Sequence, residues 1–128
     1  MILLTGGAWQ GQEEWIRAHA GEKAVVADGK TDDPEMVFQA GAALNFQAWV
    51  RRMVKEAKEE KEILDFEEKA ARSGPDMILS MDQVGCGIVP ADPFERRYRE
   101  MAGKTGQFLA AMADEVYIIT AGIGQRIK

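Results

Sequence analysis

Short apolar runs alternate with helix-like segments throughout this chain, and this alternation restricts the possible folds more than any other feature of the sequence. Residues 1–5, 23–27, 76–81 and 115–120 are apolar runs of the length expected for buried strands. Strands that alternate with helices form parallel sheets through right-handed crossovers. The sequence therefore predicts a single α/β domain, residues 1–128, in which helices cover both faces of a mostly parallel sheet.

The expected helices cover residues 11–20, the segment from Asp33-Pro34 to Val54, residues 65–72 and residues 93–113. Asp33 and Pro34 are typical of a helix start, with Asp as the N-cap and Pro at the first helical position. After them, apolar residues recur at roughly helical spacing. The run of Lys and Glu at 55–62 is interpreted as a solvated helix surface or connection.

Composition and charge exclude several classes of protein. A net charge of −5 argues against a nucleic-acid partner, because binding to a duplex depends on clustered Lys and Arg. No apolar run approaches the roughly 20 residues that cross a bilayer. A single cysteine, Cys86, and a single histidine, His19, exclude a disulfide framework and argue against a zinc site. We therefore expect a cytoplasmic protein that binds neither nucleic acid nor membrane.

The first predicted strand runs into a glycine-rich turn, Gly6-Gly7-Ala8-Trp9-Gln10-Gly11-Gln12-Glu13, and then into a helix. The glycine spacing is that of a phosphate-binding loop, G-x-x-x-x-G-K-[ST], but Gln12 and Glu13 replace its Lys and Ser/Thr. Loss of the lysine removes a charge-assisted contact worth about 1.5–3 kcal/mol. The carboxylate of Glu13 would lie near the phosphates, where like charges ~4 Å apart repel by about 4 kcal/mol. The residues alone leave a weakened nucleotide site and a plain helix-capping turn as open alternatives.

Several stretches, in order and at matching spacings, resemble the adenosylcobinamide kinase/adenosylcobinamide-phosphate guanylyltransferase family of cobalamin biosynthesis. They are Asp33-Pro34-Glu35-Met36, Val84-Gly85-Cys86-Gly87-Ile88-Val89-Pro90, Arg96-Arg97-Tyr98-Arg99-Glu100, Gly103 with Gln107, Ala113-Asp114-Glu115-Val116 and Ala121-Gly122-Ile123. The resemblance implies a P-loop-type fold, reduced in size, and a nucleotide, GTP or ATP, held at residues 6–13. It also implies transfer chemistry on a corrinoid and assembly as a homo-oligomer.

Position by position, the catalytic groups of that family fall on other residue types in this chain. The Walker lysine falls on Gln12 and the Walker serine on Glu13, and the guanylylated histidine falls near Ala43. The Asn-Glu pair before V-G becomes Asp82-Gln83. The central strand with its Walker B-like Asp is not recognisable, so we expect a missing strand and an exposed sheet edge, which an oligomer would cover.

Several residues keep two interpretations at this stage, and others have one expected role. Trp9 either stacks on a base or fills the emptied phosphate pocket, and Asp82 either binds a metal or caps its turn. We expect salt bridges to acidic residues for Arg96, Arg97 and Arg99; the alternative is that they form an anion-binding site that faces the loop. Cys86 is expected to be a small apolar position and not a reactive thiol. Trp15 is expected to pack in the core and His19 to lie at the surface.

Two hypotheses of function follow from this pattern. The first is a non-catalytic relative that keeps the fold, has no catalytic residues and binds a nucleotide, a corrinoid or a protein partner around residues 6–13, Asp82 and Gln83. The second is an altered but active nucleotide-dependent kinase or nucleotidyltransferase that acts on a corrinoid. The second requires a new catalytic group, because phosphoryl transfer and a covalent histidine intermediate both need side chains that this chain lacks. The first is therefore preferred.

Overall fold

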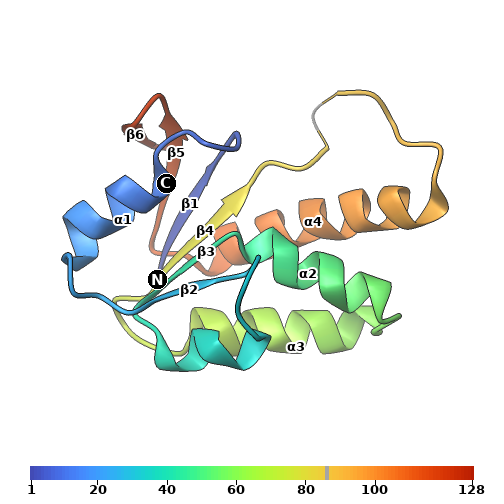
Figure 1. Ribbon diagram of the computed structural model, residues 1–128, viewed down its shortest axis with the longest axis horizontal. Coiled ribbons are helices and arrows are strands. Elements are labelled where there is room, and N and C mark those ends of the chain that lie inside the picture. The colour runs from blue at the N-terminus through green and yellow to red at the C-terminus, as the bar shows by residue number, and fades with distance from the viewer. Residues whose placement is uncertain (86) are drawn as a thin grey trace.

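The computed structural model describes residues 1–85 and 87–128, so the interpretation of Cys86 lies outside the described residues (Figure 1). The elements follow in the order β1 (Ile2–Gly6), α1 (Gln12–Ala20), β2 (Val26–Asp28), a 3₁₀ helix (Pro34–Gln39), β3 (Ala42–Leu44), α2 (Phe46–Lys55), α3 (Glu60–Ala71), β4 (Ile78–Asp82), α4 (Pro93–Met112), β5 (Glu115–Thr120) and β6 (Ile123–Arg126). The predicted α/β class is confirmed.

These strands form one six-stranded sheet in the order β2-β3-β4-β1-β5-β6. β1 lies in the middle and pairs in parallel with β4 and β5, which aligns Gly6 with Asp82. Only β6 runs antiparallel, as a hairpin partner of β5. The carboxyl ends of β1 to β5 therefore meet at one edge of the sheet, where open α/β folds bind their ligands.

Helices cover both faces of the sheet, as predicted (Figure 1). On one face, Ile16 of α1 packs with Leu4 and Ile78 in a small apolar cluster. The opposite face contributes Leu3 and Leu79 to a larger cluster that includes residues of α2, α3 and α4. None of the helices in the described part of the chain is long and apolar enough to cross a membrane.

The prediction of one helix from Asp33 to Val54 is wrong. The chain forms a short 3₁₀ helix, then β3, and only then α2. A backbone turn at Asn45, with φ of 55° in the left-handed region, separates β3 from α2. Ala42 and Ala43 are fully buried on opposite faces of the sheet, and alanine suits a short buried strand as well as a helix. Helical spacing of the apolar residues was therefore misleading here.

The expectation that a strand of the family is missing stays a prediction, but the described strands leave no gap in the sheet. β3 pairs in parallel with β2 and with β4, so the sheet is continuous from β2 to β6. The second predicted strand, 23–27, lies slightly later, at Val26–Asp28. The antiparallel strand β6 was not predicted, because its residues are exposed and carry no apolar alternation. Residues 55–62 are exposed around the α2–α3 connection, which confirms the interpretation of that run.

Candidate functional site

The phosphate-type loop lies between β1 and α1, and its backbone path depends on two glycines. A Cβ on Gly6 would lie 2.5 Å from the carbonyl oxygen of Ile119, because β5 passes directly beside it. Gly11 has φ of +98°, and a Cβ there would lie 3.0 Å from the Cα of Gly122. Both positions exclude side chains, so the close packing of the loop on β5 and on the β5–β6 turn requires glycine.

The buried side chain of Gln12 closes the loop from within. Its Nε2 donates a hydrogen bond to the carbonyl oxygen of Gly7 at 2.8 Å, and its Oε1 accepts one from the backbone N–H of Gln10 at 3.1 Å. Only 6% of Gln12 is exposed. One of the backbone donors that such a loop would offer to an anion is thus already bonded to a side chain of the protein.

A second glutamine, Gln10, attaches the loop to the far end of the chain. Its Oε1 accepts a hydrogen bond from the Ala121 N–H at 2.8 Å, and its backbone carbonyl accepts one from the Gly122 N–H at 2.7 Å. The Ala121-Gly122-Ile123 stretch, identified in the sequence as part of the family resemblance, therefore forms the turn that supports the loop.

A cavity of ≈ 280 Å³ opens beside the loop, at the carboxyl edge of the sheet. It is lined by the loop and α1 residues Ala8, Trp9, Gly11, Gln12, Glu13 and Glu14, and by Asp28, Lys30, Leu44, Asn45, Ser80 and Asp82. The second group comes from the ends of β2, β3 and β4 and the residues that follow them. The volume of the cavity lies near the lower limit for small-molecule pockets, which is about 300 Å³.

Asp82 forms the inner wall of this cavity together with Ser80, which is 1% exposed. The backbone N–H of Asp82 donates to Oε1 of Gln47 at 3.0 Å, which fixes the end of β4 against α2. Burial raises the pKa of the Asp82 carboxyl above its usual range, although Lys30 and Gln47 act in the opposite direction. The carboxyl thus has a greater affinity for a proton than a solvated aspartate has.

The cavity carries more negative than positive side chains. Glu13, Glu14, Asp28 and Asp82 contribute carboxylates, whereas Lys30 is the one basic residue among those that line it. Asp28 is held in place by hydrogen bonds, since its Oδ1 accepts from Asn45 Nδ2 at 2.8 Å. Among residues 1–85 and 87–128, no group of three or more His, Cys, Asp or Glu could hold a metal ion. The lining alone repels a polyphosphate.

Trp9 does not fill the loop, so that alternative is wrong. The side chain is 93% exposed, and its backbone has φ of 60°, which turns it outward from the loop. The buried amide of Gln12 takes the interior position instead. Lys30 Nζ lies 5.4 Å from the centroid of the Trp9 ring, at the rim of the cavity. The indole is therefore free to contact a ligand at the rim.

The loops after β1 and β4 are neighbours, because the Gln83 N–H donates to the carbonyl oxygen of Gly6 at 2.7 Å. Asp82 lies at the cavity, but Gln83 does not line it. Gln83 borders a separate hollow between the sheet and α4. The structure thus brings residues 6–13 and Asp82 together and places Gln83 on the other side of β4.

The arginines of the Arg96-Arg97-Tyr98-Arg99 stretch form none of the ion pairs found in the described part of the chain, which contradicts the salt-bridge prediction. Arg99 instead donates hydrogen bonds to the carbonyl oxygens of Gly85, Gly87 and Ile88, and Arg97 donates to that of Lys58. A guanidinium has several donors in a fixed plane, so it can hold several carbonyls of one loop. Arg97 and Arg99 thus bind backbone carbonyls of the protein, and none of the three arginines lines the cavity.

The predictions for Trp15 and His19 are confirmed. Trp15 is partly buried and packs beside Tyr117, with ring centroids 5.0 Å apart. His19 is exposed and stacks on Trp15, at 3.5 Å between centroids. Its position on α1, away from the lining of the cavity, does not suit a nucleophile of this site.

The residues of the cavity lining that were not predicted from the sequence include Asp28, Lys30, Asn45 and Ser80. Asp28 and Asn45 were missed because β2 and β3 were misplaced, and the ends of strands were therefore assigned to the wrong residues. Ser80 is the only polar residue in the apolar part of β4, and alternation along the strand puts it on the same face as Asp82. That alternation was the available signal.

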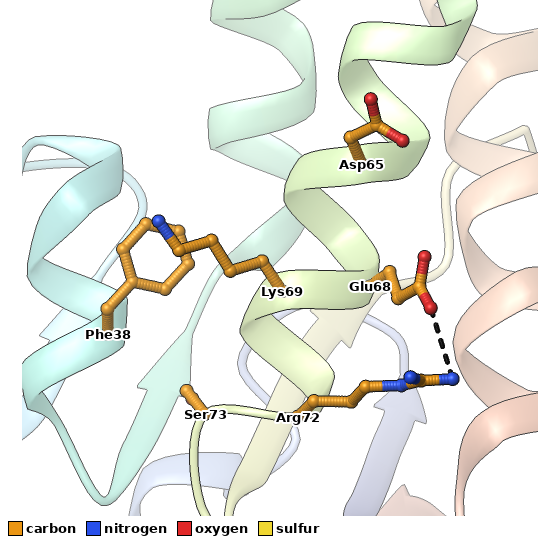
Figure 2. A pocket seen from close by; sticks show the side chains of 6 residues that line it. All are labelled: Phe38, Asp65, Glu68, Lys69, Arg72 and Ser73. Carbon is orange, nitrogen blue, oxygen red and sulfur yellow. Dashed lines mark ion pairs between the residues drawn. The ribbon is translucent and has the colours of Figure 1, made fainter.

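A larger hollow, ≈ 580 Å³, lies against α3 and the 3₁₀ helix (Figure 2). Figure 2 shows Glu68 and Arg72 pointing toward one another, as an ion pair of 3.0 Å. The ammonium of Lys69 lies over the ring of Phe38, 4.3 Å from its centroid. These charged groups already contact partners within the protein, so this hollow is a weaker candidate than the cavity at the loop.

Comparisons with known proteins identify the family of the chain. A sequence profile of the CobU family, described as cobinamide kinase / cobinamide phosphate guanyltransferase, matches residues 42–127. The chain is 30% identical over 122 residues to the bifunctional adenosylcobalamin biosynthesis protein CobU of Escherichia coli (strain K12), a match that covers 94% of this chain and 67% of that protein.

A protein of the same name from Salmonella typhimurium (strain LT2) is 46% identical over 52 residues, which is 41% of this chain and 29% of that protein. The chain thus spans less than the full length of both relatives. Together with the parallel α/β sheet and the glycine loop, these matches confirm the resemblance: the chain belongs to the cobinamide kinase / cobinamide phosphate guanyltransferase family.

Proposed function

We propose that this chain is a non-catalytic relative of the cobinamide enzymes, one that binds a ligand or a protein partner at the carboxyl edge of its sheet. The observation that carries the proposal is the closed loop: the Gln12 amide bridges Gly7 and Gln10 where a kinase loop would face phosphate. An amide carries no charge, so it cannot replace the lysine that stabilises phosphoryl transfer.

The charges around the loop support the same proposal. The carboxylates of Glu13 and Asp82 line the cavity, and Lys30 is the one basic residue of that lining, although Arg17 pairs with Glu13 at 3.8 Å from outside it. A carboxylate ~4 Å from a phosphate repels it by roughly 4 kcal/mol at an effective dielectric constant of 20. A nucleoside triphosphate would therefore bind poorly, whereas a ligand without phosphate, such as a corrinoid, or a protein surface would not meet this repulsion.

A second candidate function is an altered, active kinase or nucleotidyltransferase that acts on a corrinoid with ATP or GTP. One observation favours it, since Glu13 and Asp82 line the same cavity and Asp82 has a raised pKa. A carboxylate of this kind could act as a general base. The proposal requires a metal ion to offset the charges, supplied together with the nucleotide.

Turnover assays distinguish the two candidates. With Mg-ATP or Mg-GTP and cobinamide, we expect no formation of ADP, of pyrophosphate or of a phosphorylated corrinoid above the level without protein. Product formation that disappears in both Glu13→Ala and Asp82→Ala would establish the active enzyme and refute the non-catalytic proposal, provided that it persists in Glu22→Ala, a variant of an exposed glutamate that does not line the cavity.

A further inference from the structure

A fully buried carboxyl, that of Glu67, lies between α3 and α4, far in the sequence from the residues of the cavity. Glu67 is 0% exposed and belongs to the buried face of α3 together with Ile63 and Ala70. Its Oε1 is hydrogen-bonded to the hydroxyl of Thr105 on α4. Its Oε2 is buried and has no hydrogen-bond partner among the described residues.

The hydroxyl of Thr105 has two neighbours that both normally accept hydrogen bonds. Besides Glu67 Oε1, it lies 2.9 Å from the carbonyl oxygen of Met101. A threonine hydroxyl has one hydrogen to donate, and a backbone carbonyl can only accept. Both contacts are satisfied at once only if Thr105 donates to Met101 and accepts a hydrogen from Glu67, so Glu67 must carry a proton.

We propose that Glu67 is the proton-binding centre of a pH-dependent contact between α3 and α4. In the protonated form, the Glu67 O–H donates to Thr105, and Thr105 donates to Met101, so the chain of donors and acceptors is complete. In the ionised form, one hydroxyl hydrogen faces two acceptors, and a carboxylate with an unpartnered oxygen remains in the apolar contact. Ionisation therefore loosens the packing of α3 on α4.

The charged groups around this contact do not neutralise Glu67. On α3, Glu60 acts on it as a like charge. On α4, Lys104 is paired with Glu60 at 3.2 Å and with Glu100 at 3.5 Å. The 3₁₀ helix that also packs on α3 carries Glu35, which is exposed. Burial, and to a lesser extent Glu60, raises the pKa of Glu67 to about 7, against the opposite effect of the Thr105 hydrogen bond.

The direction of the pH dependence follows from this raised pKa. In the unfolded chain Glu67 has the ordinary glutamate pKa of about 4.3. Between that pH and about pH 7, the folded state therefore holds a proton that the unfolded state has released. The stabilisation of the folded state by this proton is complete below the unfolded-state pKa of about 4.3. It is lost as the pH rises to about 7 and beyond, with a roughly tenfold rise in the unfolding constant per pH unit between the two values.

The test compares urea unfolding of the wild type, Glu67→Gln and Glu62→Gln between pH 5 and 9. Gln keeps the shape and donates permanently to Thr105, and Glu62 is an exposed residue of the same helix. We expect the ratio of unfolding constants, wild type to Glu67→Gln, to rise about fortyfold from pH 5 to 7. Glu62→Gln should follow the wild type. Parallel pH profiles for wild type and Glu67→Gln would overturn the proposal.

A ¹³C NMR titration of the glutamate carboxyl carbons measures the pKa of Glu67 in the folded wild type directly. The result does not depend on how stable the variant is. The resonance that is absent in Glu67→Gln is assigned to Glu67, and in the folded wild type it should titrate near pH 7. A midpoint at the ordinary glutamate value of about 4.3 would show that the buried carboxyl is ionised at neutral pH and would refute the inference.

Discussion

Replacing Gln12 with lysine and Glu13 with serine is expected to give this chain a higher affinity for nucleotides than the unmodified chain has. The backbone of the loop already has the glycine spacing and the helix start of a phosphate-binding loop. Lysine would remove the amide bridge between Gly7 and Gln10 and supply the missing positive charge, and serine would remove a carboxylate from the lining. The loop amides could then turn to an anion.

The measurement is thermal unfolding with and without Mg-ATP or Mg-GTP. At a nucleotide concentration about 100-fold above Kd, binding stabilises the folded state by about 2.7 kcal/mol, which is a rise in Tm of several degrees. The matched control is Gln12→Lys with Glu22→Ser, which has the same change of net charge but keeps Glu13, because Glu22 is exposed and does not line the cavity. Equal shifts in both double variants would show that Glu13 does not oppose phosphate.

Replacing Gly6 with alanine is expected to be among the most destabilising single substitutions in the chain. The new Cβ would lie 2.5 Å from the backbone carbonyl oxygen of Ile119 on β5, which pairs in parallel with β1. A backbone atom cannot rotate away as a side chain can, so the two strands must separate. We expect a loss of at least about 3 kcal/mol, a large part of the 5–15 kcal/mol that stabilises a typical domain.

The neighbouring glycine provides the control for this substitution. A Cβ on Gly7 would meet only the Cγ of Gln10, at 3.7 Å, which is an ordinary contact. Gly7→Ala should therefore change the free energy of urea unfolding by less than about 0.5 kcal/mol. If Gly6→Ala were as stable as Gly7→Ala, the claim that β5 passes too close to Gly6 to leave room for a side chain would be refuted.

The long and strongly patterned elements could be predicted from the sequence, whereas short ones could not. The strand at Glu115–Thr120 and the helix that begins at Pro93 have the predicted bounds or nearly so. Each contains enough residues to show its periodicity. β3 has only three residues, and its alanines fit the helical spacing of the apolar residues around it. Only pairing with β2 and β4 selects a strand there.

Within the site, the sequence identified the residues that follow one another in a motif but not those that the fold brings together. Residues 6–13 could be recognised from the spacing of the glycines. The buried role of Gln12 could not, because it depends on where the side chain turns within the loop. Glu67 carried a local signal, since it follows Ile63 by four residues on one helix face, but its burial depends on the packing of α4.

The most direct test of the non-catalytic proposal is a calorimetric titration of the unmodified chain with Mg-GTP and Mg-ATP at millimolar concentration. The closed loop and the acidic lining predict no saturable heat of binding for either nucleotide. A saturable isotherm with micromolar Kd, abolished in a variant that blocks the cavity such as Ser80→Trp but retained in Gly7→Ala, would contradict the account.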